Sequence, residues 1–272
     1  MKILVGVVAT LFVTVFSSQV YATEGFPGRI KYKDVPVYEL HQLFNNLNKV
    51  VVVDTRSKFE FDTLRIKGAI NIPVSQKSFE SNIIKLSRKT DKPIVYYCNG
   101  HTCMKSYKAV KKSMAINIGN TFAYDAGIFD WVRAHPDKSV LLGQSPVNLN
   151  RLIANKKLKS KMLHPDTFAD KVSRLGSDSV VIDIRDKYQR AAIGFFPAKE
   201  RWISLNKMDS LHHYINKAKR SNKTIFIYDE VGKQVRWLQY ALEKANVKNY
   251  YFMHDGASGY YDHMAKLAWP DN

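Results

Sequence analysis

Cysteine is nearly absent from this chain: only two of its 272 residues are cysteines. Cys98 and Cys103 lie five positions apart, which excludes a disulfide-rich scaffold but leaves open a local disulfide or a pair of reactive thiols. Cofactor motifs are also missing, because the sequence has no phosphate loop, no dinucleotide-binding glycine pattern and no set of metal ligands. We therefore expect no cofactor and no metal, and the two sulfur atoms become the first candidates for chemistry.

Acidic side chains are few relative to basic ones. The chain has 24 Asp and Glu against 42 Lys and Arg, a formal net charge of +18, and the basic residues are spread along its whole length. Three interpretations are open: a surface that attracts small oxyanions or anionic partners, a solvated surface without a specific role, and nucleic-acid binding. Because the sequence has no nucleic-acid-binding motif and begins with an export signal, we expect no nucleic-acid partner.

Long apolar runs are missing beyond the N-terminus. There, Lys2 precedes an apolar stretch, residues 3–16, that is too short to span a bilayer comfortably, and Val20 and Ala22 fit a cleavage site. We predict a signal peptide over residues 1–22 with cleavage after Ala22; the alternative is an uncleaved anchor. The predicted location is the bacterial periplasm, an oxidising compartment, with no membrane attachment after cleavage.

The remaining sequence alternates apolar strand-like runs with amphipathic helix-like segments. Residues 50–54 are a β-branched run of the kind buried on both faces of a parallel sheet. An irregular lead-in over residues 23–35 precedes it. Because strands alternate with helices, we predict an α/β fold with a parallel sheet covered by helices on both faces. The expected helices are residues 38–47, 57–64, 78–87, 105–114 and 127–134. Further strands are expected at residues 68–73 and 93–97, and residues 115–123 are expected to hold a turn and another strand.

The second half of the chain repeats the pattern of the first. Residues 179–185 echo residues 50–56, residues 223–229 echo residues 92–98, and residues 255–261 echo the segment that begins at Asp125. The offset is 129 for the strand-end aspartates, Asp54 and Asp183, and 131 for the loop starts, Cys98 and Asp229. A nearly constant offset indicates duplicated domains. We predict domains over residues 23–142 and 164–272, joined by a linker over residues 143–163.

Cys98 lies where a reactive cysteine is expected. It follows an apolar strand, and a helix begins shortly after it, at Lys105. In such a loop the backbone N–H groups and the positive end of the helix dipole stabilise a thiolate, and Lys105 and His101 add positive charge. The sequence therefore predicts that Cys98 is a nucleophile.

Four motifs in order carry a family resemblance. They are Asp54-x-Arg56, the segment 68–73, a strand ending in Cys98, and a helix that starts with glycine, isoleucine and an aromatic residue at 127–129. This order resembles the rhodanese-like sulfurtransferases, over roughly residues 36–135 and again over 165–268. The resemblance implies tandem rhodanese-like domains, each a parallel sheet flanked by helices on both faces, in an exported protein.

The resemblance also implies a reaction. In rhodaneses a six-residue loop that begins with the cysteine cradles a persulfide, and that loop is residues 98–103 here. Sulfane sulfur would pass from a small anionic donor of the thiosulfate type to Cys98, and from there to cyanide, a thiol or a protein acceptor. The expected substrate-binding residues are Asn99, Gly100, His101, Thr102 and Lys105. The loop departs from the common form, with glycine third and cysteine sixth, and Arg65 replaces the usual histidine.

Other residues near the loop keep more than one interpretation. Cys103 could be a resolving thiol, the partner of Cys98 in a stable disulfide, or a bystander. Asp54 and Arg56 could brace the loop or contact the substrate, and the repeat of this pair in the second half favours a brace. In the second loop Asp229 replaces the cysteine and cannot carry sulfur, so the second domain is expected to be inactive.

Two further functions compete with sulfur transfer. One is a thiol–disulfide or oxyanion-handling redox protein that uses the Cys98/Cys103 pair. The other is a non-catalytic rhodanese-fold protein that binds an anion or a protein.

Overall fold

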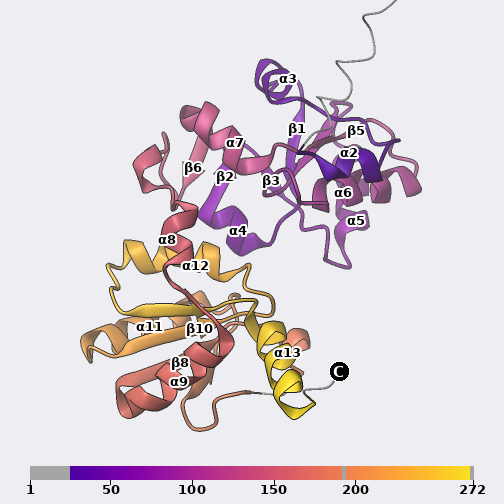
Figure 1. Ribbon diagram of the computed structural model, residues 1–272. Helices are drawn as coiled ribbons and strands as arrows, with labels where there is room; N and C mark the ends of the chain where they lie inside the picture. The colour runs from indigo at the N-terminus through magenta and orange to yellow at the C-terminus, as the bar shows by residue number, and fades with distance from the viewer. Residues whose placement is uncertain (1–24, 192–193, 270–272) are drawn as a thin grey trace, which may run out of the picture. The chain divides into compact units, whose positions relative to one another are not determined.

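The computed structural model describes residues 25–191 and 194–269 (Figure 1), and the predicted signal peptide lies outside these residues. The chain divides into two compact units. The first runs from the described N-terminus to Ser57 and from Ile66 to Lys138, and the second comprises Lys58–Arg65 and all described residues from Ser139 onward. No helix within residues 25–191 and 194–269 is long and apolar enough to cross a bilayer.

The first unit is built on a parallel four-stranded sheet with the order β3-β1-β4-β5. Its strands are β1 (Val51–Asp54), β3 (Ile70–Asn71), β4 (Ile94–Tyr97) and β5 (Thr121–Tyr124). Its helices are α2 (Pro27–Lys31), α3 (Leu40–Asn45), α5 (Phe79–Ser87), α6 (Lys105–Ala115) and α7 (Gly127–Ala134), followed by the 3-10 turn η1 (Pro136–Lys138).

Strand β4 is the best-buried strand of this sheet. All four of its residues are buried, because β1 and β5 flank it and helices cover it. Tyr96 packs in one core with Phe79 of α5 and Val110 of α6. The chain therefore passes directly from a buried strand into Cys98.

The second unit is built on a parallel five-stranded sheet with the order β7-β11-β10-β8-β9. Its strands are β7 (Met162–Leu163), β8 (Ser179–Asp183), β9 (Glu200–Trp202), β10 (Thr224–Tyr228) and β11 (Tyr250–Met253). Its helices are α4 (Lys58–Thr63), α8 (Asn155–Lys159), α9 (Pro165–Leu175), α10 (Lys187–Arg190), α11 (Met208–Arg220), α12 (Val235–Lys244) and α13 (Gly256–Ala268), with the 3-10 turns η2 (Leu149–Arg151) and η3 (Gly176–Asp178). A further pair of strands, β2 (Leu64–Ile66) and β6 (Ser139–Leu141), forms its own two-stranded sheet.

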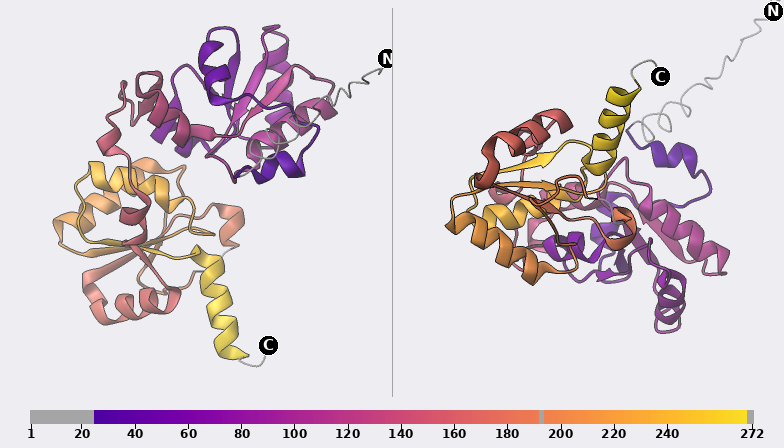
Figure 2. Two further views of the ribbon diagram at one scale, coloured as in Figure 1. Left: turned by 45° about the horizontal axis from the view of Figure 1, so that its top comes forward. Right: turned by 90° about the horizontal axis from the view of Figure 1, so that it is seen from below.

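The two large sheets repeat one strand order. The order β9-β8-β10-β11 in the second unit corresponds, strand by strand, to the order β3-β1-β4-β5 in the first unit. Helices cover both faces of the second sheet (Figure 2): α11 and α12 contribute to one core, and α9 and α13 contribute to the other. The predicted fold class, α/β with parallel sheets flanked by helices, is confirmed.

Residues 143–163, expected to be a linker, contain regular structure. Besides η2 and α8, this segment contains β7, whose Met162 and Leu163 align with Phe252 and Met253 at the edge of the second sheet. A two-residue strand with half-buried side chains has no recognisable sequence pattern. The helix expected over residues 57–64 is present as α4, and its Phe59 packs against a core of the second unit.

Candidate functional site

Cys98 directly follows β4 and is almost completely buried, with 1% of its surface exposed. Its backbone carbonyl accepts the N–H of Ile128, in the first turn of α7, at 3.0 Å. The sulfur is thus fixed at the carboxyl end of the central strands. This is the edge of an open parallel sheet at which ligands commonly bind.

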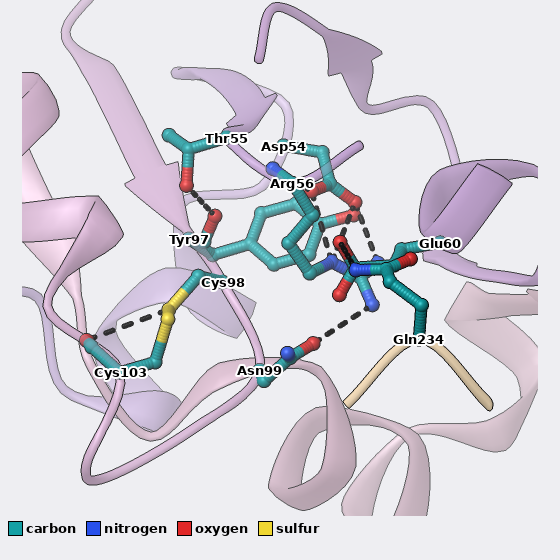
Figure 3. The surroundings of a disulfide bond; sticks show 9 residues. All are labelled: Asp54, Thr55, Arg56, Glu60, Tyr97, Cys98, Asn99, Cys103 and Gln234. Carbon is teal, nitrogen blue, oxygen red and sulfur yellow. Dashed lines mark hydrogen bonds and ion pairs between the residues drawn. A yellow bond between two sulfur atoms is a disulfide. The ribbon is translucent and has the colours of Figure 1, made fainter. Parts of the chain in front are cut away.

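The two cysteines form a disulfide (Figure 3), with 6.4 Å between their Cα atoms. The amide of Cys103 donates to the carbonyl of Gly100 at 2.7 Å, which closes the loop into a turn. The sulfur of Cys98 lies 3.4 Å from the carbonyl oxygen of Cys103. Of the interpretations left open by the sequence, an unpaired Cys103 is therefore wrong for this state. Any thiolate chemistry at Cys98 requires reduction of this bond first.

A glycine at the start of α7 allows the cysteine loop to pack closely. Gly127 has φ of 72°, and a Cβ atom there would lie 2.5 Å from the Cα of Gly100 and 2.6 Å from the carbonyl carbon of Asn99. No side chain fits in that gap, and φ in this range also favours glycine. Gly100 itself has φ of 152°. The loop and the start of α7 are therefore in direct backbone contact.

Asp54 and Arg56 form a buried ion pair that reaches the cysteine loop (Figure 3). Arg56 donates from Nη2 to Asp54 at 2.6 Å and from its backbone N–H at 2.9 Å, and both side chains have no exposed surface. Nη1 of Arg56 also donates to the side-chain oxygen of Asn99 at 3.3 Å. The predicted pair and one predicted loop residue are thus joined in one network, which is the geometry that a brace requires.

His101 is held on two sides. Its ring stacks on Phe26, with ring centroids 4.2 Å apart, and its Nε2 lies 2.7 Å from Oδ2 of Asp130. Thr102 is exposed, and Lys105 is partly exposed at the start of α6. Phe26 was not predicted from the sequence, because it lies in a segment that looked like an irregular lead-in.

The helix that follows Phe26 is anchored to the same unit. Arg29 donates from Nε to Asp125 at 2.8 Å, and the hydroxyl of Tyr107 donates to the same carboxylate. Burial raises the pKa of Tyr107, and its hydrogen bond to Asp125 raises the pKa further. Gly28 lies flat against the ring of Tyr107, where any Cβ atom would overlap it. The short α2 is therefore a packed element beside the loop.

The second loop shows an anion-binding arrangement of backbone groups. The carboxylate of Asp229 accepts the N–H groups of Val231 at 3.1 Å and Val235 at 3.2 Å, and also those of Gly232 and Gln234. Burial raises the pKa of Asp229, and these four donors oppose that rise. Asp229 follows β10 as Cys98 follows β4.

The backbone around Asp229 matches that around Cys98. The carbonyl of Asp229 accepts the N–H of Ala257 at 2.8 Å, just as the carbonyl of Cys98 accepts that of Ile128. A glycine precedes each donor, and Gly256 has φ of 60°. An Asp183–Arg185 pair, with Nη2 2.9 Å from Oδ2, repeats the ion pair of the first unit. A carboxylate therefore occupies, in the second unit, the position that the sulfur occupies in the first.

Comparison with protein families gives a match within the first half of the chain. Residues 37–134 match the rhodanese-like domain family, so the chain contains a rhodanese-like domain there. Among curated proteins, none matches this sequence. Within the described part of the chain, no group of three or more His, Cys, Asp or Glu side chains could hold a metal ion.

Several solved structures are partly similar. A thiosulfate sulfurtransferase from Pseudomonas aeruginosa is 13% identical, with a TM-score of 0.39, and the match covers 85% of this chain and 43% of that one. The BH2092 protein from Bacillus halodurans is 22% identical, with a TM-score of 0.38, covering 51% of this chain and 98% of that one. Wild-type EanB is 14% identical, with a TM-score of 0.34, and the match covers 85% of this chain and 61% of that one. None of these likenesses assigns an activity to this chain.

Proposed function

We propose that this protein is a sulfurtransferase that carries sulfane sulfur as a persulfide on Cys98. The observation that carries the proposal is the position of Cys98, at the end of β4 in a rhodanese-like domain, where the matching loop holds the Asp229 carboxylate in four backbone N–H groups. The same kind of cradle around the sulfur of Cys98 would stabilise a thiolate and a persulfide anion.

The proposed reaction has two transfer steps after reduction of the disulfide. In the first, the Cys98 thiolate attacks the outer sulfur of an anionic donor of the thiosulfate class. The donor's S–S bond breaks, its outer sulfur joins Cys98, and the oxyanion leaves with the bonding electron pair. In the second, an acceptor thiolate or cyanide attacks the terminal sulfur, and the Cys98 thiolate is released.

The surroundings of Cys98 support roles for its neighbours. Asn99, Gly100 and Thr102 would contribute mainly through their backbone, and His101 and Lys105 would add positive charge toward an anionic donor. Asp54 and Arg56 would brace the loop through Asn99. The net charge, +18 for the full sequence and +17 once Lys2 is removed with residues 1–22, would raise the local concentration of small anions around the site.

The test is the intact mass of the reduced protein before and after thiosulfate, followed by cyanide. We expect one added sulfur atom that cyanide removes, in the wild type and in Cys103→Ser, and no added sulfur in Cys98→Ser. Cys103→Ser is the matched control, because it removes the other cysteine of the same loop. Sulfur that still loads onto Cys98→Ser would end the proposal.

The disulfide favours a second candidate function, thiol–disulfide chemistry at the same loop. Here the Cys103 thiolate attacks the inner sulfur of the Cys98 persulfide, so that the bond to the outer sulfur breaks and hydrogen sulfide leaves. The resulting Cys98–Cys103 disulfide is then reduced by an external dithiol. This candidate requires Cys103 for turnover. In the absence of any added thiol, the loaded wild type would release sulfide and gain the disulfide, whereas loaded Cys103→Ser would keep its persulfide until cyanide or a thiol is added. Simple transfer predicts that both proteins keep the persulfide until an acceptor is added.

We also propose that the protein acts in the bacterial periplasm after removal of residues 1–22. An oxidising compartment fits a disulfide between the only two cysteines. N-terminal sequencing of the exported protein would then begin at Thr23, and an uncleaved N-terminus in the membrane fraction would contradict this.

A further inference from the structure

The second unit contains a basic cavity that the proposed sulfur chemistry does not use. It has a volume of about 340 Å³ and is lined by residues from η3, β8, β9, α11 and the start of β10. Four of the lining side chains are cationic, and none is acidic; the cationic residues are Lys199, Arg201, Lys217 and Lys223. The volume is that of a small-molecule site.

Strand alternation explains why Arg201 faces the cavity. Glu200 of β9 points to the other face of the sheet, where it accepts from Arg190 at 2.9 Å and from the hydroxyl of Tyr228 at 2.6 Å. Arg201, the next residue of β9, therefore points to the face covered by α11, whereas Lys199 precedes the strand and its amine donates to the carbonyl of Val172 in α9. Strand β9 thus places the Glu200 carboxylate and the Arg201 guanidinium on opposite faces of the sheet.

Helix α11 supplies the opposite wall. Tyr214 and Lys217 lie three residues apart on one face of α11, and Ser221 directly follows the helix at its C-cap. Ser177 adds a further hydroxyl group at the base of β8, where the hydroxyl of Ser179 already donates to the carbonyls of Val172 and Gly176. Phosphate and sulfate oxygens accept hydrogen bonds both from hydroxyl groups and from cationic side chains.

Carboxylates within residues 25–191 and 194–269 do not neutralise these four cations. Among the described residues, none of the four forms an ion pair: Lys199 donates to the carbonyl of Val172 at 3.1 Å, and Arg201 donates to the carbonyl of Glu200 at 3.0 Å. Two simpler roles apply to single members of this set. Lys217 lies in the last turn of α11, where a cation interacts favourably with the helix dipole, and Lys199 adjoins the edge strand β9, where a lysine discourages pairing with another chain. Neither role explains why four cations from three segments converge on one cavity.

The cavity is separate from the Asp229 loop. It lies at the amino ends of the strands, beside Ser179 at the start of β8 and Lys223 just before β10, whereas Asp229 follows the carboxyl end of β10. We propose that this cavity binds a small polyanion, a soluble molecule that carries at least two phosphate or sulfate groups. This site is independent of Cys98 and of the proposed transfer reaction.

The test is calorimetric titration of the protein without residues 1–22, with inorganic pyrophosphate as the ligand and at low ionic strength. We expect one site per chain with a Kd below about 1 mM, and a loss of roughly tenfold or more in Lys217→Gln/Lys223→Gln. The matched control is Lys244→Gln/Lys248→Gln, which removes the same charge from exposed positions of the same unit outside the cavity. Its affinity is expected to stay within about twofold of the wild type.

Three outcomes would overturn the proposal. They are the absence of saturable binding, an equal loss in both double variants, which indicates only diffuse positive charge, and a loss of binding in Cys98→Ser, which moves the site to the cysteine loop. Circular dichroism checks that each variant is folded. Arg201→Gln, a single change at an exposed position, tests the same site if the double variant does not fold.

Discussion

The carbonyl of Cys98 accepts the N–H of Ile128 at 3.0 Å, and this bond ties the end of β4 to the first turn of α7. The second unit repeats the bond between Asp229 and Ala257 at 2.8 Å. In both places the residue before the donor is a glycine with positive φ. The position of the sulfur therefore depends on a glycine that makes no bond to it.

Gly127→Ala tests this dependence. The new Cβ would overlap Gly100 and adopt an unfavourable φ, so we expect a loss of roughly 2–4 kcal/mol in the free energy of unfolding. Sulfur loading on Cys98 should fall as well. The matched control is Gly68→Ala, which shares the positive φ (83°) but has no atom within 4 Å of the new Cβ. It should cost about 1 kcal/mol and leave loading intact. Equal losses in urea denaturation would contradict the packing argument.

Arg56→Met tests the buried ion pair. It would leave the Asp54 carboxylate buried without its cation, at an expected cost of about 3–5 kcal/mol in urea denaturation. The double variant Asp54→Leu/Arg56→Met removes both charges and should recover much of that loss. If the double variant is no more stable than the single one, the cost does not come from an unpaired charge.

Phe26→Ala tests the contact between α2 and the cysteine loop. Loss of the stack on His101 should free the loop, with a stability cost of about 1 kcal/mol. We expect dithiothreitol to reduce the Cys98–Cys103 disulfide faster in this variant. Ile30→Ala is the matched control, because Ile30 lies in α2 but is 63% exposed. An unchanged reduction rate in Phe26→Ala would show that the stack does not order the loop.

Glu200 predicts a pH dependence of stability. Burial raises its pKa, but hydrogen bonds from Tyr228, Arg190 and two amides outweigh burial, so the pKa lies below its ordinary value of 4.5. The folded protein then binds fewer protons than the unfolded chain near that pH. The stability that the carboxylate contributes is present above pH 4.5 and is lost as the pH falls through the folded-state pKa.

Comparison with Glu200→Gln isolates this contribution. The difference in free energy of unfolding between wild type and variant should be roughly 1–3 kcal/mol at pH 7 and should shrink as the pH falls below 4.5. The exposed Glu80, 3.7 Å from Lys112, provides the control, and Glu80→Gln should change stability by less than about 0.5 kcal/mol. A difference that stays constant with pH would show that the ionised carboxylate is not responsible.

The sequence predicted most of the sheet because burial on both faces demands continuous apolar runs. Residues 50–54 and 93–97 have that composition, and they are β1 and β4. Strand β9 lacks it: its residues Glu, Arg and Trp contain one apolar side chain, and pairing with β8 forms the strand. Local composition cannot reveal a strand that depends on its neighbour.

The cysteine loop was predicted for a similar reason, since a cysteine between a buried run and a helix start is a local pattern. The role of Phe26 was not, because its partner His101 is 75 positions away. The disulfide was one of several alternatives, since two cysteines five residues apart are compatible with any of them. The Asp229 cradle required the structure, because backbone N–H directions are invisible in the sequence.

Helix α4 has a consequence for dividing the protein into fragments. Its residues belong to the second unit although they precede most of the first in the chain. Cutting the gene after Lys138 would therefore yield a C-terminal polypeptide that lacks Phe59 and exposes the apolar surface on which that ring packs. Such a fragment should be prone to aggregation, and a peptide of residues 58–65 supplied in trans should suppress it. During synthesis, the ribosome makes the last piece of this folding unit about 200 residues after the first, so the second unit can complete its core only when nearly the whole chain has emerged.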